Sequence, residues 1–166
     1  MTDHQEIIAA LTDRFGEVNA SEFRGQQRIV IPHDASFSAM HFLKESNGFD
    51  FLVDITCVDY LNYRDATDRF GVAYLLANIG TSQRITVRVF VNEPDPSIES
   101  VTSLWAGANW LEREVWDMFG IQFNGHPDLR RILLPEEFTV HPLRKDYPLQ
   151  GRGERHNFPV LRRAQA

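Results

Sequence analysis

The residues with the greatest chemical potential in this sequence lie in one segment, EREVWDMFGIQFNGHPDLRRIL, at residues 112–133. Carboxylates, aromatic rings and a histidine stand side by side there, and acid–base catalysis uses these residue types. Glu112, Glu114 and His126 would be the proton-carrying groups of such a site. A buried contact between proteins has a similar composition. The segment therefore supports two hypotheses, a free-standing acid–base enzyme and a surface held by another protein.

A helical wheel of residues 110–119 tests these hypotheses in part. Arg113, Glu114 and Asp117 share one polar sector, which we expect to face solvent, and apolar side chains occupy most of the remaining circumference. Glu112 falls in the apolar sector, where a carboxylate is costly to bury unless it is paired. We expect such a helix to be covered on two sides, either by a sheet and the C-terminal segment or by a sheet and a partner protein.

A structural role explains Glu112 without any catalysis. Asn109, three residues earlier, makes a capping-box pattern with Glu112, and a helix N-terminus favours negative charge. Arg130 and Arg131 are candidate partners for Glu112 and Glu114, because the planar guanidinium fork matches a carboxylate. The sequence leaves open whether Glu112 caps its helix or has a special role.

Other catalytic and cofactor sites lack a sequence signature. His126 stands before a proline, and a histidine in a turn is more often a hydrogen-bonded structural residue than a general base. It recurs with His141 and His156 at intervals of fifteen residues, which are too wide for a local metal motif. The single cysteine, Cys57, excludes an internal disulfide and a self-contained iron–sulfur cluster, and we expect it to be an inert core thiol. We therefore predict no catalytic, cofactor-binding or metal-binding residue.

Hydrophobic periodicity predicts the elements that position this segment. We expect helices over residues 4–15 and from a cap at Asp34 to about Ser46, a third that begins at Pro96, and a fourth that ends at Gly120. Strands are expected over QRIVIP, FDFLVDITCVDY, FGVAYLLANI and RITVRVFV, and the GTSQ link predicts a hairpin between the last two. The inward face of the second strand is expected to hold Phe49, Phe51, Val53, Ile55 and Cys57. The fold class is α+β, with a mixed, largely antiparallel four-stranded sheet covered by helices.

Charge and proline content divide the chain into two parts. Residues 1–125 carry 9 basic and 18 acidic side chains, whereas residues 126–166 carry 8 and 5 and hold five of the eight prolines. We predict a single α+β domain over residues 1–125 and an extended Pro-rich docking arm over residues 126–166. The basic arm is expected to dock on its own acidic body or on another acidic protein, and no nucleic acid partner is expected. Without a secretory signal or an apolar span, we expect a soluble protein that can sit beside a membrane.

Two sequence blocks resemble one known family. Glu112-Arg113-Glu114, Asp117, Met118-Phe119, His126, Arg130 and Ile132-Leu133 fit the signature of the C subunit of respiratory complex I, the bacterial NADH-quinone oxidoreductase, which is similar to the mitochondrial thirty-kilodalton subunit. The stretch HPLRKDYPL at residues 141–149 resembles the C-terminal arm of that family. Val140 departs from the pattern, because the family usually has glycine at that position.

The resemblance implies a subunit of the peripheral arm of proton-translocating NADH:quinone oxidoreductase, on the cytoplasmic side of the bacterial inner membrane. It implies that the chain binds no cofactor, that FMN and iron–sulfur clusters lie in the neighbouring proteins, and that the chain scaffolds the quinone-reducing module. The implied partners are chiefly the large D subunit of complex I and also its B and I subunits. An equivalent subunit of a related membrane-bound hydrogenase-type complex is an alternative that the sequence leaves open.

The family motif also implies a set of residues at contacts with these partners. Among them we expect Trp116, Phe119, Arg144, Lys145 and Tyr147 to form much of the contact with the large D subunit. The full set of motif and interface residues is Glu112, Arg113, Glu114, Trp116, Asp117, Phe119, His126, Arg130, Arg131, His141, Arg144, Lys145, Asp146 and Tyr147.

Overall fold

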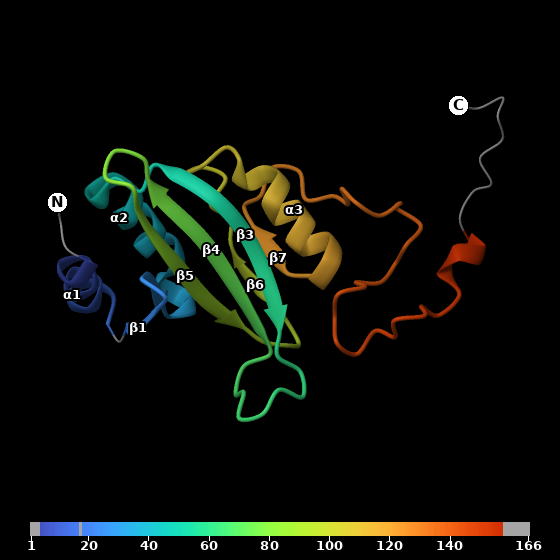
Figure 1. Ribbon diagram of the computed structural model, residues 1–166. Coiled ribbons are helices and arrows are strands. Elements are labelled where there is room, and N and C mark those ends of the chain that lie inside the picture. Colours follow the sequence, from blue (N-terminus) through green and yellow to red (C-terminus); the bar gives the residue numbers. More distant parts are fainter. Residues whose placement is uncertain (1–3, 17, 158–166) are drawn as a thin grey trace.

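A five-stranded sheet forms the centre of the computed structural model, which describes residues 4–16 and 18–157 (Figure 1). Its order is β1-β2-β5-β4-β3; β2 and β5 pair in parallel and the other neighbours are antiparallel. The strands are β1 (Asn19–Phe23), β2 (Gln26–Val30), β3 (Phe51–Asp59), β4 (Phe70–Asn78) and β5 (Gln83–Val91). The α+β class and the mixed, largely antiparallel sheet are confirmed. The predicted number of four strands is wrong, because all five residues of β1 are exposed and therefore show no apolar alternation.

Three helices accompany the sheet, and among the helices described none is long and apolar enough to span a membrane. They are α1 (His4–Phe15), α2 (Ser36–Asn47) and α3 (Ala108–Phe119), and a 3-10 turn, η1 (His33–Ala35), precedes α2. The predicted cap of α2 at Asp34 is wrong, because Asp34 lies within η1 and its carboxylate contacts His33. Gly48 ends α2 with a φ of 70°, as its position after the helix predicts.

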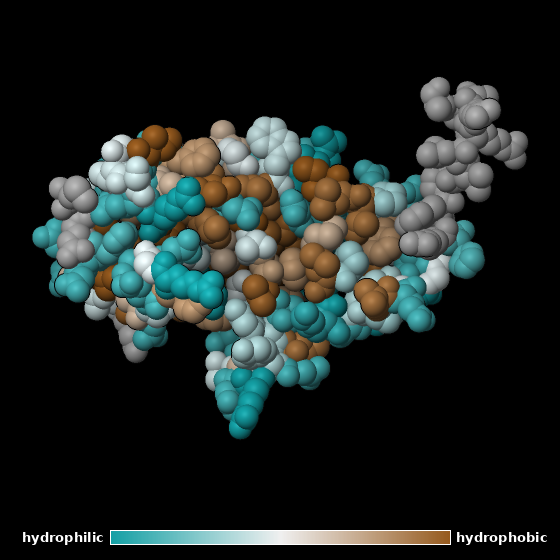
Figure 2. Space-filling model, viewed as in Figure 1, coloured by the Kyte–Doolittle hydropathy of each residue, from teal (hydrophilic) through white to brown (hydrophobic). Residues whose placement is uncertain are grey.

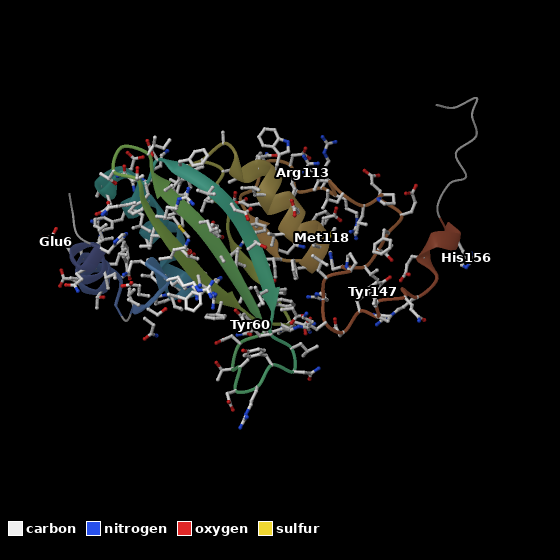
Figure 3. The ribbon with its side chains drawn as sticks, in the orientation of Figure 1. Glu6, Tyr60, Arg113, Met118, Tyr147 and His156 are labelled. Atoms are coloured by element: carbon white, nitrogen blue, oxygen red, sulfur yellow. The ribbon has the colours of Figure 1, made fainter. Side chains whose placement is uncertain are left out.

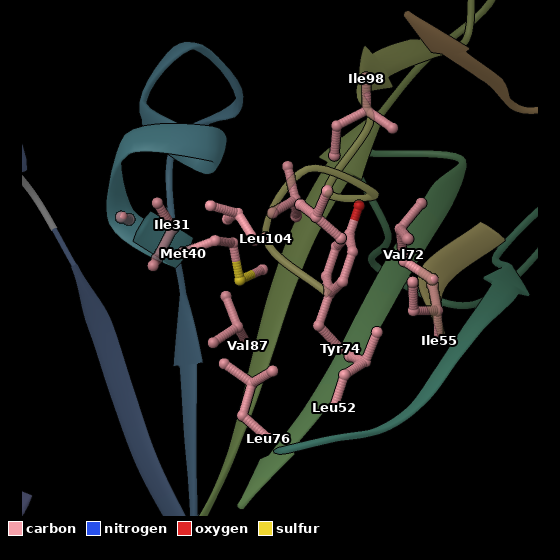
Figure 4. Close-up of a cluster of buried hydrophobic side chains, with 14 of the residues drawn as sticks. Ile31, Met40, Leu52, Ile55, Val72, Tyr74, Leu76, Val87, Ile98 and Leu104 are labelled. Atoms are coloured by element: carbon pink, nitrogen blue, oxygen red, sulfur yellow. The ribbon is translucent and has the colours of Figure 1, made fainter. Parts of the chain in front are cut away.

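The core lies between the helices and one face of the sheet (Figure 4). Tyr74 of β4 stands at its centre, with Met40 of α2 and Ile98 and Leu104 from the segment before α3 around it. Cys57 is buried in the same cluster, and burial raises the pKa of its thiol to about 12. The prediction of an inert core thiol is therefore confirmed in its burial and its protonated state.

The helix predicted to begin at Pro96 is absent. Residues 97–99 form β6 (Ser97–Glu99), which pairs in parallel with β7 (Gln122–Asn124). The four apolar residues that suggested a helix are all buried, but they reach the core from a short strand followed by tight turns. The partner strand comes from beyond α3, so local periodicity could not reveal it. The four residues are Ile98, Val101, Leu104 and Trp105.

A bulge in β3 reverses part of its predicted alternation. The register with β4 shifts between Leu52 and Asp54, so that Leu52 and Ile55 point into the core. Phe51 and Val53, which were predicted to be internal, are 49% and 41% exposed. One extra residue in a strand exchanges the two faces on either side of it, and this explains the error.

Candidate functional site

The motif segment of the sequence begins on α3, whose buried face packs on the core beside β3 (Figure 1). Gly120 ends α3 with a φ of 78°, which confirms the predicted stop. The chain then passes through β7 and continues from residue 126 as an arm that is extended up to a final 3-10 turn, η2 (Glu154–Asn157). The site is the junction between α3, the arm and one end of the sheet.

Glu112 is fully buried and is bound within its own chain. Its carboxylate accepts hydrogen bonds from the Ser100 hydroxyl and the Val101 amide, each at 2.7 Å. Burial raises the pKa of Glu112 to about 7, although both hydrogen bonds act in the opposite direction. The predicted capping box with Asn109 is wrong, since α3 begins at Ala108 and has no side-chain cap at Gly107. Glu112 instead joins α3 to the loop that follows β6.

Asp117 is the second buried carboxylate, and it holds the arm. One oxygen contacts the Arg131 guanidinium at 2.5 Å, and the other accepts the three successive amides of residues 132–134 at 2.8 to 3.1 Å. Burial raises the pKa of Asp117, but the amides of Leu134 and Leu133 and the guanidinium outweigh it, so that the net pKa is lowered. The helical wheel placed Asp117 in a solvent-facing sector, and this is wrong because the arm covers it.

The arm also completes the C-terminal end of α3. The last four carbonyls of a helix have no partner within the helix, and here each of them accepts a hydrogen bond from a later residue. The donors are Gly120 for Trp116 at 2.8 Å, His141 for Asp117 at 3.1 Å, Leu143 for Met118 at 3.1 Å and Arg144 for Phe119 at 2.8 Å. The two arginines at this end, Arg131 and Arg144, carry the charge that favours the negative pole of the helix.

His141 fits closely against this helix end. Its Nδ1 donates to the Asp117 carbonyl, and its ring meets the Trp116 ring edge-on with centroids 6.3 Å apart. Burial lowers the pKa of His141 and therefore favours the neutral ring. A Cβ on Gly120 would lie 2.7 Å from the imidazole, so the glycine is required both for its φ and for this contact.

A second ionic cluster ties the arm to the end of the sheet. Arg69, the residue before β4, contacts three carboxylates: Asp59 at 3.3 Å, Glu93 at 2.5 Å and Asp146 of the arm at 2.9 Å. The hydrogen bond from Arg69 lowers the pKa of Asp146. Arg144 contacts Glu93 at 3.2 Å from the arm side. The basic arm therefore docks on acidic groups of its own body, which is one of the two partners that its charge predicted.

The predicted roles of Arg130, Arg131 and His126 can now be compared with the structure. Arg130 contacts Asp128 and Arg131 contacts Asp117, so the predicted pairs with Glu112 and Glu114 are wrong. His126 has a structural role, as predicted: one ring nitrogen lies 3.1 Å from the Asn109 carbonyl and the other accepts the Asp128 amide.

The remaining motif residues divide between buried and exposed positions. Arg113 donates from α3 to the carbonyls of Arg130 and Arg131 (Figure 3). Glu114 is exposed on the same helix. Phe119 is buried in the core and Trp116 is partly covered. Lys145 uses only its backbone amide, which donates to Asp59 at 2.8 Å, and its side chain is exposed. Tyr147 contacts Phe138 edge-on within the arm.

The geometry of this junction is that of a structural contact and not of an acid–base site. The two oxygens of Glu112 are occupied inside the core, Glu114 faces solvent and His126 binds backbone, so the three predicted acid–base groups do not share a site. Sequence reasoning missed Asp59, Arg69, Glu93 and Ser100, which lie far from the motif in the chain. Only Asp59 could have been found from the sequence, because it is an acidic residue at an inward position of a strand whose other inward residues are apolar. No group of three metal-ligating side chains occurs within residues 4–16 and 18–157.

The family model described as "Respiratory-chain NADH dehydrogenase, 30 Kd subunit" matches residues 29–153, which include α3, its junction with the arm and most of the arm. The chain belongs to this family. Within this family, the C subunit of NADH-quinone oxidoreductase from Geobacter sulfurreducens is 41% identical over 153 residues, covering 91% of this chain and 93% of the relative. NADH-quinone oxidoreductase subunit 5 of Thermus thermophilus is 50% identical over 131 residues, covering 75% of this chain and 63% of the relative. These relatives of the 30 kDa subunit are parts of an enzyme complex, so other proteins of that complex are partners.

Two solved structures resemble the chain. A structure described as the trypsin-resistant fragment (1-134) of Nqo5 is 43% identical, with a TM-score of 0.64, and covers 68% of this chain and 89% of that chain. A chain of the membrane-bound sulfane sulfur reductase, an archaeal respiratory membrane complex, has a TM-score of 0.75 and covers 96% of this chain and 93% of that chain. Its identity of 22% extends the comparison to the fold alone.

Proposed function

We propose that this member of the 30 kDa family is a structural subunit of the peripheral arm of NADH:quinone oxidoreductase. It binds no cofactor, and electrons pass from NADH to quinone through FMN and iron–sulfur clusters in the neighbouring proteins. Its task is to hold the quinone-reducing module in position, through contacts chiefly with the large D subunit and also with the B and I subunits. The complex places it on the cytoplasmic side of the bacterial inner membrane.

The observation that carries this proposal is the arm, which is fixed on its own body and still exposes apolar side chains. Asp117 and Asp59 bind arm backbone amides, and Arg131 and Arg144 bind the end of α3. Leu133, Leu143 and Leu149 nevertheless point outward from the same stretch, at 60%, 52% and 104% exposure. An ordered segment that exposes three leucines along a polar path is a surface that another protein covers.

Arg144 and Lys145, which the sequence placed together at the partner contact, have different roles in the arm. Arg144 makes contacts within the chain, so its charge reversal would release the arm before it affected a partner. The exposed side chain of Lys145 makes no ion pair among the described residues, so it is free to meet the large D subunit. A Lys145→Glu variant therefore reports on a partner, and an Arg144→Glu variant reports on the arm itself.

The test is co-purification from native membranes of a tagged full-length chain carrying Leu133→Asp and Leu143→Asp. We expect a loss of the D, B and I subunits, while the unfolding temperature of the purified chain stays unchanged. Ile79→Asp is the matched control, because Ile79 is also more than half exposed but lies on the β4–β5 turn away from the arm. Equal recovery of these partners with the double variant and with the control would overturn the role of the arm.

A further inference from the structure

The helices leave one face of the sheet uncovered, and we name it the open sheet face. It is built from the side chains of β2, β5, β4 and β3 that alternate with the core residues. Phe51, Val53 and Val58 of β3 lie on it, each at least 41% exposed, and the bulge in β3 turns the first two outward. Figure 2 shows apolar side chains gathered over the strands. An apolar surface of this kind on a member of a complex is typical of a contact site.

Beside the apolar strip formed by Phe51, Val53 and Val58, the open sheet face carries a row of arginines. Arg84 and Arg88 alternate with buried residues of β5, and Arg28 of β2 is paired in register with Thr86 between them. Among the described residues, none of these three guanidinium groups forms an ion pair, and Arg28 instead lies over the Phe23 ring at 4.7 Å. On this face the strands carry one carboxylate, Asp54 of β3, which is in register with Leu75. The arginine row is therefore a local positive exception on a chain with a net charge of -6.

A hollow of about 270 Å³ lies at the end of the same face. Tyr60, Tyr63 and Phe90 line it; the ring centroid of Tyr60 lies 5.8 Å from that of Tyr63 and 6.0 Å from that of Phe90. Arg88 also lines it, so the hollow is continuous with the arginine row, and the loop on the other side adds Arg64, Asp65 and Asp68. Tyr60 stands where the strands meet the projecting loop (Figure 3). An aromatic hollow next to a charged row accepts one apolar anchor side chain from a partner.

We propose that the open sheet face binds an amphipathic, acidic segment of another protein of the same complex. Its carboxylates pair with Arg28, Arg84 and Arg88, its apolar residues cover Phe51 and Val53, and one apolar side chain enters the hollow. The inference rests on the proposed function, because it takes the neighbour from the same assembly. The surface is separate from the arm, so the chain would hold two neighbouring segments at once.

Charge selects this occupant over the others that could reach the face. The C-terminal residues 158–166 carry two arginines and no carboxylate side chain, so they have the wrong sign. In a symmetric dimer, a second copy would present the same surface, so three further arginines would enter the interface and only the Asp54 carboxylate of β3 would come with them. Only a partner that brings negative charge neutralises the row and buries the apolar strip.

The first experiment uses the tagged full-length chain in native membranes and reverses the charge of two arginines. We expect Arg84→Glu with Arg88→Glu to lower the recovery of the neighbouring protein by about tenfold, because like charges oppose at the contact. The matched control, Arg84→Lys with Arg88→Lys, keeps both charges and should recover that protein within about twofold of the wild type. Unchanged recovery with the charge-reversed variant would overturn the proposal.

A second experiment keeps the arginines and does not depend on the folding of that variant. A photo-crosslinking p-benzoylphenylalanine at Val53 should attach, in the purified complex, to a peptide of another protein that is rich in Asp or Glu. Attachment only to a second copy of this chain, only to lipid, or to no protein would overturn the proposal. If the wild-type chain copurifies with the D and B subunits in these cases, the proposed function survives and only this surface fails. If the wild-type chain copurifies with neither, the proposed function fails.

Discussion

Asp117 and Arg131 form a buried contact between the domain and the arm. The Asp117 side chain has no exposed surface, its carboxylate meets the guanidinium at 2.5 Å, and the same guanidinium also lies over the Trp116 ring at 5.6 Å. The pair stands at the end of α3, where the three amides that follow Arg131 also bind Asp117. A single carboxylate therefore sets the direction in which the arm leaves the domain.

Removal of the charge at Asp117 should release the arm. Asp117→Asn leaves the Arg131 guanidinium buried without a carboxylate, which costs about 3 kcal/mol of unfolding free energy. We expect faster tryptic cleavage at Arg144 and Lys145, measured together with the urea midpoint. Asp128→Asn is the control, because its ion pair with Arg130 is exposed and contributes less than about 1 kcal/mol. Equal cleavage rates in both variants would contradict the role of Asp117.

Acid should weaken the same contact in the wild-type protein. The folded pKa of Asp117 lies below the ordinary value of 3.8, so its stabilisation is fully present above pH 3.8 and is lost as pH falls through the folded pKa. The urea midpoint of the wild type should therefore fall in this acid range by more than that of Asp117→Asn. Parallel curves for the two proteins below pH 3.8 would argue against the linkage.

Glu112 should act in the opposite sense. Its folded pKa of about 7 exceeds the ordinary value of 4.5, so its contribution to stability is fully present below pH 4.5 and is lost as pH rises through about 7. Glu112→Gln keeps the shape of the side chain and cannot ionise. Relative to the wild type, it should gain about 3 kcal/mol of unfolding free energy between pH 4.5 and pH 8, measured by urea unfolding. Glu114→Gln, at an exposed position, should follow the wild type; a flat difference curve for Glu112→Gln would refute the prediction.

Two glycines at the ends of α3 offer a matched pair. Gly120→Ala introduces a Cβ at a φ of 78° and only 2.7 Å from His141, so we expect a loss of more than about 1 kcal/mol. Gly107→Ala should change stability little, since its φ is -63° and a Cβ there meets no atom within 4 Å. Thermal unfolding measures the melting temperature of each variant, and we expect that of Gly120→Ala to be the lower. Similar melting temperatures would contradict the close contact with His141.

Arg69 holds three carboxylates, and its loss should affect both the sheet end and the arm. Arg69→Leu leaves Asp59, Glu93 and Asp146 without their shared cation, and we expect a loss of about 3 to 5 kcal/mol of unfolding free energy. Arg64→Leu, whose side chain is 93% exposed in the same loop, should stay within about 0.5 kcal/mol of the wild type. Chemical denaturation compares the two, and a loss below about 1 kcal/mol for Arg69→Leu would show that the cluster is only a surface feature.

Local patterns in the sequence determined most of the elements. Apolar spacing located α1 and four of the five sheet strands, Gly48 and Gly120 marked two helix ends, and the charge contrast pointed to a basic arm docked on an acidic surface. These features depend on residues close together in the chain, which is why a linear pattern carries them. The boundary between domain and arm at residue 125 remains a prediction.

Only the tertiary structure decided what the buried charges bind. Capping of its own helix was one of the roles considered for Glu112, and Asp117 was expected to face solvent. Their partners instead lie in a loop before the helix and in an arm after it. The bulge at Val53 and the pairing of β6 with β7 likewise depend on strands that are distant in sequence. A helical wheel shows which residues share a side of a helix. Long-range packing determines which segment covers that side. Once a carboxylate is buried there, it must bind whatever donors that segment brings, and these donors decide its structural role.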